Sequence, residues 1–415
     1  YVRDVGIDRT VRIELAPGDG RGRTVTLSTF APSWPTAWLR LFVGATFTLV
    51  GISVFWFHPG RRESWSSLFA CVAWGISVTA GLGAPRTMQT AIDVHSHMLC
   101  DEWLDLFKAH SGPRFSIRKV TGGKEVIHAD GVPFMTPTPG MFDYQARFAA
   151  MGEAGVDMAV LSLTGPNVYW GDADASSTAA RVINDSFADA HRAYPERIRW
   201  IASLPMQYPE RALGELQRAV DLGAVGVMVL ANIGGAQWTD PLFAPVWAEL
   251  DRRALPVFMH PTVPCGCDLM GMAEYQLSAS VGFPFDSTMA VSRMIFDGFF
   301  DRYPNLKLIV AHGGGTLPFL AGRLDRCWEV IPACRVNISR PPSEYLKRIY
   351  ADTALYTREA LRDTIETFGG ENVMYGTDFP HTNSDMGPSL ARINELPSVL
   401  RDNLRGRNAK RIFGI

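Results

Sequence analysis

The chain has 415 residues, of which 47% are hydrophobic and 20% are charged, so it is long enough to bury a large core. A formal net charge of −2 gives no electrostatic reason to expect a nucleic-acid partner, and six scattered cysteines argue against a disulfide framework. These numbers favour one large α/β domain with an appended segment.

The appended segment precedes Met88. Residues 1–30 have the pattern of short strands, and the uncharged stretches that follow predict hydrophobic helices at about 36–57 and 64–85. Both are long enough to be candidate transmembrane helices, and a buried helical hairpin is the alternative. If translation starts at Met88, residues 1–87 are not part of the working protein. We expect a cytoplasmic protein, tethered to a membrane through residues 36–85 if residues 1–87 are expressed.

Short apolar runs alternate with helical patterns throughout residues 88–415. Near-continuous apolar runs are typical of strands buried on both faces, and eight strand–helix repeats predict a (β/α)₈ barrel. A doubly wound open sheet is the alternative, although no G-x-G-x-x-G follows the first strand. The eight runs are 91–95, 156–163, 199–205, 224–230, 256–260, 307–312, 348–355 and 372–378.

The segment from Cys100 to Phe142 is rich in Gly and Pro and has no assigned strand of the barrel. We expect a long loop that covers a pocket, because long loops at barrel mouths often form lids. A disordered surface insertion is the alternative.

Polar residues with metal-binding side chains gather at the predicted strand ends. His95, His260 and His312 end the first, fifth and sixth strands, His97 lies just beyond the first, and Asp378 ends the eighth. His95 and His97 should point to one side, because side chains alternate along a strand. Three imidazoles and a carboxylate suit zinc or a similar divalent ion, which leaves His312 as a further ligand or a base.

Four motifs, "AIDVHSHML", "FMHPT", "IVAHGGGTLPFLAGRLDR" and "VMYGTDFPH", resemble the amidohydrolase superfamily over about residues 90–415. They are most similar to its branch of metal-dependent decarboxylases typified by aminocarboxymuconate-semialdehyde decarboxylase. The resemblance implies a distorted (β/α)₈ barrel with one divalent metal ion, usually Zn²⁺ and in some relatives Mn²⁺.

The resemblance also implies roles for individual residues. His312 matches the catalytic histidine, with Asp378 as its partner in proton transfer. Arg323 matches an arginine that a neighbouring subunit contributes to the substrate carboxylate, which implies a homodimer. The positions that match the metal ligands are His95, His97, His260 and Asp378.

Two positions depart from the pattern of the type enzyme. Met135 stands near the place of a substrate-binding arginine, and Thr262 follows Pro261 where the type enzyme has tryptophan. Arg114, Arg118 and Lys119 are candidates to replace that arginine. The substrate is therefore left open within the branch.

The first functional hypothesis is non-oxidative decarboxylation of a small aromatic or unsaturated carboxylic acid, by a metal-dependent carboxy-lyase. The second is hydrolysis of a lactone, ester or amide at the same mononuclear site. A sensor or binding domain is a third hypothesis, which the full set of candidate ligands disfavours.

Overall fold

The protein is represented by a computed structural model that describes residues 2–5, 10–15, 23–28, 90–119 and 123–415. The chain divides into two units, Tyr1–Met88 and Gln89–Ile415. The hydrophobic helices predicted at about 36–57 and 64–85 lie outside the described residues. Among the helices that are described, none has the length and apolar character needed to cross a membrane.

The described part of the first unit is a small antiparallel sheet in the order β1-β2-β3. It confirms the short strands predicted for residues 1–30. The bounds are β1 Val2–Val5, β2 Thr10–Leu15 and β3 Arg23–Ser28.

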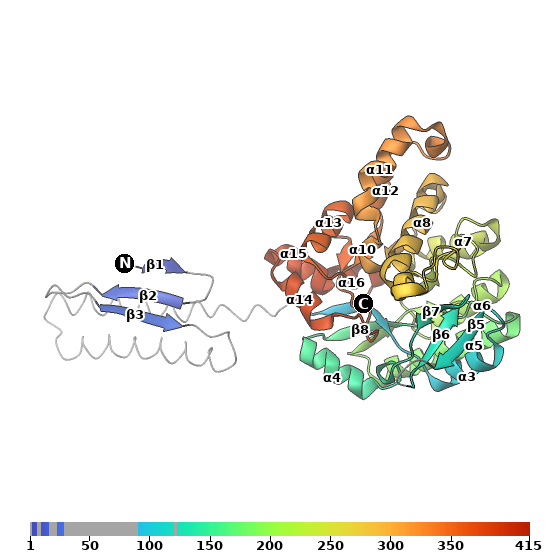
Figure 1. Cartoon of the computed structure of the whole chain (residues 1–415), viewed down its shortest axis with the longest axis horizontal. Coiled ribbons are helices and arrows are strands. Elements are labelled where there is room, and N and C mark those ends of the chain that lie inside the picture. Colours follow the sequence, from blue (N-terminus) through green and yellow to red (C-terminus); the bar gives the residue numbers. More distant parts are fainter. Residues whose placement is uncertain (1, 6–9, 16–22, 29–89, 120–122) are drawn as a thin grey trace. The chain divides into compact units, whose positions relative to one another are not determined.

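The second unit is an α/β fold built on parallel strands (Figure 1). Two ladders run in the orders β4-β8-β9 and β10-β11-β12-β13-β14-β15. Each of the eight predicted apolar runs overlaps at least one of these strands. Their bounds are β4 Ile92–His97, β8 Met158–Ser162, β9 Ile198–Trp200, β10 Ala202–Ser203, β11 Val227–Leu230, β12 Pro256–His260, β13 Lys307–Val310, β14 Tyr350–Asp352 and β15 Val373–Met374.

Hydrogen bonds also connect the first strand of this unit to the segment after the last. The Val94 amide donates to the Tyr375 carbonyl at 2.9 Å, and the His97 amide donates to the Phe379 carbonyl at 2.7 Å. These bonds bring the histidines of β4 next to the loop that carries Asp378.

Helices follow most of the parallel strands and surround them (Figure 1). Side-chain caps begin several of them; Asp143, for example, accepts hydrogen bonds from the amides of Gln145 and Ala146 at the start of α4. The helices are α3 Asp101–His110, α4 Tyr144–Ala154, α5 Ala173–Ala193, α6 Pro209–Asp221, α7 Ala244–Arg253, α8 Phe283–Phe296, α9 Phe299–Arg302, α10 Ala311–Gly314, α11 Leu317–Val330, α12 Pro342–Leu346, α13 Arg358–Phe368, α14 Met386–Asn394, α15 Ser398–Asp402 and α16 Asn408–Phe413. Shorter helical turns are η1 Pro139–Met141, η2 Pro241–Phe243, η3 Glu274–Gln276, η4 Ser278–Gly282, η5 Pro332–Arg335 and η6 Asn403–Arg407.

The strands are buried on both faces, as their apolar composition predicts. In β12, Val257, Phe258 and Met259 are each at most 1% exposed. A long apolar side chain buried this way contributes roughly 1.5–3 kcal/mol relative to an exposed one. The core therefore fixes the strands, and their carboxyl ends give the polar residues a rigid base.

The segment from Cys100 to Phe142 corrects the prediction of a loop. It contains α3 and a small antiparallel sheet of β5 Phe115–Lys119, β6 Glu125–Ala129 and β7 Val132–Met135. Its strands are short and mix polar with apolar residues, so the sequence pattern gives only a weak strand signal. The segment is an ordered subdomain and not a disordered insertion.

Candidate metal centre

Two histidines project from one side of β4. His95 and His97 are fully buried, and their Nε2 atoms lie 3.0 Å apart. Ser96 points away from them, and its hydroxyl accepts a hydrogen bond from the guanidinium of Arg147. This alternation confirms the expected direction of the H-x-H pair.

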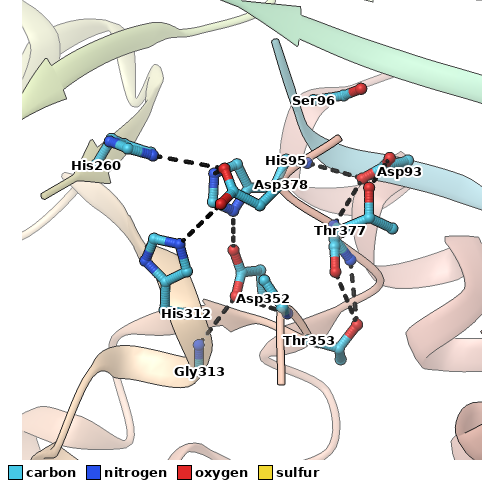
Figure 2. A network of polar contacts seen from close by, with 12 residues as sticks. Asp93, His95, Ser96, His260, His312, Gly313, Asp352, Thr353, Thr377 and Asp378 are labelled. Atoms are coloured by element: carbon cyan, nitrogen blue, oxygen red, sulfur yellow. Dashed lines mark hydrogen bonds and ion pairs between the residues drawn. The ribbon is translucent and has the colours of Figure 1, made fainter. Parts of the chain in front are cut away.

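The carboxylate of Asp378 joins these histidines to two others (Figure 2). Its Oδ1 lies 3.2 Å from His95 Nε2, 3.1 Å from His97 Nε2 and 3.8 Å from His260 Nε2. Its Oδ2 lies 3.4 Å from His312 Nε2. The structure thus brings all five predicted strand-end residues into one cluster.

Three of these residues do not end their strands as predicted. β4 runs on to His97, so His95 lies within it. β13 ends at Val310 and β15 at Met374, so His312 and Asp378 lie in the segments that follow. Their φ angles are 56° and 63°, in the left-handed region that costs a non-glycine residue about 1–2 kcal/mol. The strained turns direct both side chains inward, which an extended strand would not do.

A glycine allows the Asp378 loop to approach the strands closely. A Cβ atom on Gly376 would lie 2.8 Å from Cβ of Asp352 and 2.9 Å from Cβ of His95. Any side chain there would push the loop away from β4 and β14, so this glycine is required by packing.

Asp352 is part of the cluster, although its sequence pattern did not single it out. It ends β14, is fully buried, and its Oδ2 lies 2.6 Å from His95 Nδ1. Its Oδ1 accepts hydrogen bonds from the amides of Gly313 and Ala354 at 2.9 and 3.2 Å. Asp352 therefore fixes the proton of His95 on Nδ1 and ties this ring to the turn that carries His312.

The hydrogen bonds of the rings indicate that the cluster suits a cation. Because His95 Nδ1 donates to Asp352 and His260 Nδ1 donates to the Pro261 carbonyl at 2.8 Å, the Nε2 atoms of the neutral rings carry lone pairs. Both lone pairs face the Asp378 carboxylate, and His260 Nε2 has no hydrogen-bond partner in the described residues.

Acceptors facing acceptors repel one another unless a positive ion lies between them. Ligands on one ion with bonds of about 2.1 Å lie about 3.0–3.4 Å apart, close to the observed separations. His95, His260, His312 and Asp378 together, and His97, Asp378 and His381 together, could each hold a metal ion. The cluster thus fits a divalent metal.

The charges of the metal-free cluster show which side chains are ready to bind a cation and which must first lose a proton. Burial lowers the pKa of His260 to about 4 and holds the pKa of His97 well below its usual value. Burial also acts to lower the pKa of His95, but the carboxylates of Asp378 and Asp352 outweigh it and raise that pKa to about 10. Burial acts to raise the pKa of Asp378, yet the nearby imidazoles hold it well below its usual range. Without a metal, His95 therefore carries a proton on both ring nitrogens, and a bound ion would replace the proton on Nε2 beside the ionised Asp378.

A second buried carboxylate braces the backbone behind the cluster. Asp93 accepts hydrogen bonds from the Thr377 hydroxyl at 2.6 Å and from the amides of Thr377 and His95, each at 3.1 Å. Burial raises its pKa to about 7. These bonds lock β4 against the residue that precedes Asp378 (Figure 2).

Arg147 braces the other side of β4 and was not found from the sequence. It lies on α4, is fully buried, and donates to the Ser96 hydroxyl and the His97 carbonyl. Its guanidinium also lies 4.9 Å from the centre of the Phe379 ring. Arg147 thus contacts two of the segments that carry the candidate ligands, β4 and the loop of Asp378.

The remaining predicted residue lies apart from the cluster. Arg323 is exposed on α11, a helix that extends from the second unit (Figure 1). No hydrogen bond or ion pair joins Arg323 to the histidines within the described ranges. His381, by contrast, lies at the cluster, with its ring centre 5.2 Å from that of His97 and its Nε2 3.0 Å from Thr164 Oγ1.

Comparison with known proteins identifies the family of the chain. The sequence profile of the family described as Amidohydrolase matches residues 92–415. The chain is 32% identical over 331 residues to 2-amino-3-carboxymuconate-6-semialdehyde decarboxylase of Dictyostelium discoideum, with 78% of this chain and 91% of that protein covered. It is 28% identical over 281 residues to gamma-resorcylate decarboxylase of Rhizobium sp. (strain MTP-10005), with 64% and 86% covered.

A solved structure has the same fold. The crystal structure of 5-carboxyvanillate decarboxylase from Sphingomonas paucimobilis superposes with a TM-score of 0.70 at 28% identity. The match covers 79% of this chain and 99% of that one. All of the cluster residues lie inside the matched length of the family, residues 92–415.

Proposed function

Because this chain belongs to the amidohydrolase family and to its branch of metal-dependent decarboxylases, we propose that it releases carbon dioxide from an aromatic or unsaturated carboxylic acid without an oxidant. The relatives are named as decarboxylases of such acids. The observation that carries the proposal is the buried cluster, in which imidazole lone pairs face one carboxylate. The chain is accordingly a metal-dependent carboxy-lyase.

We assign one divalent ion to the cluster, either Zn²⁺ or Mn²⁺, with Zn²⁺ favoured by the nitrogen-rich ligand set. The ligands would be His95, His97, His260 and Asp378. When bound, the ion supplies Lewis-acid chemistry at the substrate and at a water molecule. The observed separations among the four side chains support this assignment.

His312 and Asp378 are the catalytic residues of the proposal. The proton is held between His312 Nε2 and Asp378 Oδ2, which lie 3.4 Å apart. It is delivered to the carbon that bears the carboxylate, the bond to the carboxyl carbon breaks, and carbon dioxide leaves. A π electron pair of the substrate makes the new C–H bond, and the pair of the broken carbon–carbon bond restores the π bond, so no oxidant or reductant is needed.

Arg323 binds the substrate carboxylate from a second subunit in this proposal. Its exposure on α11 leaves the guanidinium available to a partner, and arginine binds carboxylates through two parallel hydrogen bonds. We therefore propose a homodimer in which each site contains one residue of the other subunit.

The finer architecture is also a proposal. The parallel ladders, joined by the bonds of Val94 and His97, support closure into a distorted (β/α)₈ barrel over residues 88–415. Residues 1–87 form a separate N-terminal extension, supported by the division of the chain at Met88. We place the barrel in the cytoplasm, which the unpaired thiols of Cys100, Cys265 and Cys267 support.

The test uses the purified full chain. Its metal content is measured, and carbon dioxide release is followed from hydroxybenzoates and unsaturated dicarboxylic acids, without oxygen or nucleotides. We expect about one divalent ion per chain and carbon dioxide release that His260→Ala abolishes together with the metal. Cleavage of a lactone or ester without carbon dioxide would instead support hydrolysis and overturn the proposal. Reconstitution with Zn²⁺ and with Mn²⁺ decides between the two ions.

A further inference from the structure

A small cavity lies beside the carboxyl ends of β11 and β12, between the segments that follow β8, β11 and β12 and the β5–β7 subdomain. Its free volume is about 10 Å³, enough for roughly one water-sized group. Leu230, at the end of β11, pairs in register with His260, at the end of β12, so the cavity lies next to that candidate ligand. The lining residues that matter here are Arg114, Tyr169, Leu230, Asn232 and Thr262.

Arg114 enters this cavity from the β5–β7 subdomain. Its position is fixed because the Asp130 amide donates to the Arg114 carbonyl at 2.9 Å, which extends the pairing of Phe115 with Ala129. Its Nε donates to Asp130 Oδ2 at 2.8 Å. A guanidinium has five N–H donors, so the Nη groups remain available to a ligand.

Tyr169 supplies a second hydrogen-bonding group. Its side chain lines the cavity, the residue is 7% exposed, and its hydroxyl lies near the backbone of Leu230. This hydroxyl makes no hydrogen bond of full geometry within the described residues, so its oxygen can accept a hydrogen bond from a ligand hydroxyl.

The acceptors around the cavity are already used. Asn232 Nδ2 donates to Asp286 Oδ1 at 3.1 Å, and the Thr262 amide donates to Asp286 Oδ2 at 3.0 Å. Asn232 Oδ1 accepts from the Gly235 amide at 3.0 Å. The groups left for a ligand are therefore mainly donors, and two carboxylates, Asp130 and Asp286, offset the charge of Arg114.

We propose that this cavity binds a phenolic hydroxyl of the aromatic acid, with Arg114 and Tyr169 as the residues that determine specificity. The inference rests on the proposed function for the placement of the reacting carboxylate at the metal. The small volume suits one ring substituent and not a whole ring. A second carboxylate is disfavoured, because its charge would add to those of Asp130 and Asp286.

The experiment measures binding of benzoate, the three monohydroxybenzoates and the three benzenedicarboxylates to the metal-loaded full chain by calorimetry. We expect at least one hydroxybenzoate to bind about tenfold more tightly than benzoate, a gain that no dicarboxylate matches. Arg114→Met and Tyr169→Phe should each reduce that gain to about twofold while the affinity for benzoate is unchanged. Arg118→Met changes an exposed arginine of β5, the strand that begins just after Arg114, and should keep the full gain.

The inference is overturned if no hydroxybenzoate gains affinity, if a dicarboxylate gains more, or if the gain persists in Arg114→Met and Tyr169→Phe. The inference would also be overturned if either variant lost affinity for benzoate as much as for the hydroxybenzoate. The residue would then bind any benzoate and would not recognise the hydroxyl. Carbon dioxide release is measured on the same acids. If a hydroxybenzoate binds more tightly than benzoate but releases no carbon dioxide, the role of this cavity is supported and the proposed decarboxylation is rejected.

Discussion

The Nδ1 atom of His95 lies 2.6 Å from Oδ2 of Asp352, and both side chains are fully buried. The bond keeps the Nε2 lone pair directed at the metal centre. Asp352→Asn should weaken this control of the tautomer and reduce metal affinity by about 10–100-fold. Competition with a chelating dye measures the affinity, and Asp189→Asn, on an exposed carboxylate, is the matched control. Unchanged affinity in Asp352→Asn would reject the role of this bond.

His312 is the candidate for proton transfer and not for ligation. His312→Gln should keep one metal ion per chain and lower kcat by about 10²–10⁴-fold, the usual contribution of a general acid or base. Elemental analysis and initial rates give the two numbers. Parallel loss of metal and activity would show that His312 is a ligand, the result that we expect of substitutions at the proposed ligands, such as His260→Ala and Asp378→Ala.

The sequence predicted what local patterns determine. Apolar runs located the parallel strands, because most of their residues are apolar and buried, whereas polar residues gather in β4 and at the ends of other strands. The period of two along a strand predicted that His95 and His97 would lie on one side, and their Nε2 atoms are 3.0 Å apart.

The remaining features depend on contacts between distant parts of the chain. Asp352 binds a histidine 257 positions away, and Arg147 contacts strand β4 from helix α4. Neither role has a signal in the neighbouring sequence. The left-handed turns at His312 and Asp378 depend on packing around glycines, which the sequence pattern does not show. The apolar runs therefore predicted strands that continue beyond their true ends at Val310 and Met374. The β5–β7 subdomain was mistaken for a loop because its short strands mix polar and apolar residues.

Arg147 should act on metal binding through the position of β4. Arg147→Met leaves the His97 carbonyl and the Ser96 hydroxyl without this donor, and each buried unpaired group costs about 1–3 kcal/mol. We expect the free energy of unfolding to fall by about 2–4 kcal/mol and metal affinity to fall about tenfold, with partial rescue in Arg147→Lys. Urea unfolding and metal titration measure both, with the exposed Arg326→Met as control. Destabilisation with full metal affinity would limit Arg147 to a folding role.

If each active site contains residues of two subunits, as proposed, then two inactive variants should restore activity when they are mixed. Dimers that combine Arg323→Ala with His312→Gln have one intact site, so a randomised equal mixture should recover about a quarter of wild-type activity. Each variant alone should be nearly inactive. A mixture of His260→Ala with His312→Gln should recover nothing, because both changes damage the cluster of their own subunit. If the first mixture is also inactive, Arg323 does not act across the dimer.

The raised pKa of Asp286 predicts that the stability of the protein depends on pH. Burial raises its pKa to about 6 from the 3.8 of an exposed aspartate, so between these values the unfolded chain has released a proton that the folded chain retains. Stability therefore falls as pH rises through this window, by up to about 3 kcal/mol from this residue. Asp286→Asn cannot ionise and should lack that fall.

The difference in unfolding free energy between Asp286→Asn and wild type should therefore shift in favour of the variant by about 2–3 kcal/mol between pH 4.5 and pH 7.5. Urea unfolding of metal-saturated protein measures it, and the metal dependence common to both chains cancels in the difference. The lost hydrogen bonds of the amide lower stability equally at every pH, so they displace the curve without changing its slope. A difference that is constant with pH would mean that Asp286 ionises in the folded protein as it does in the unfolded chain.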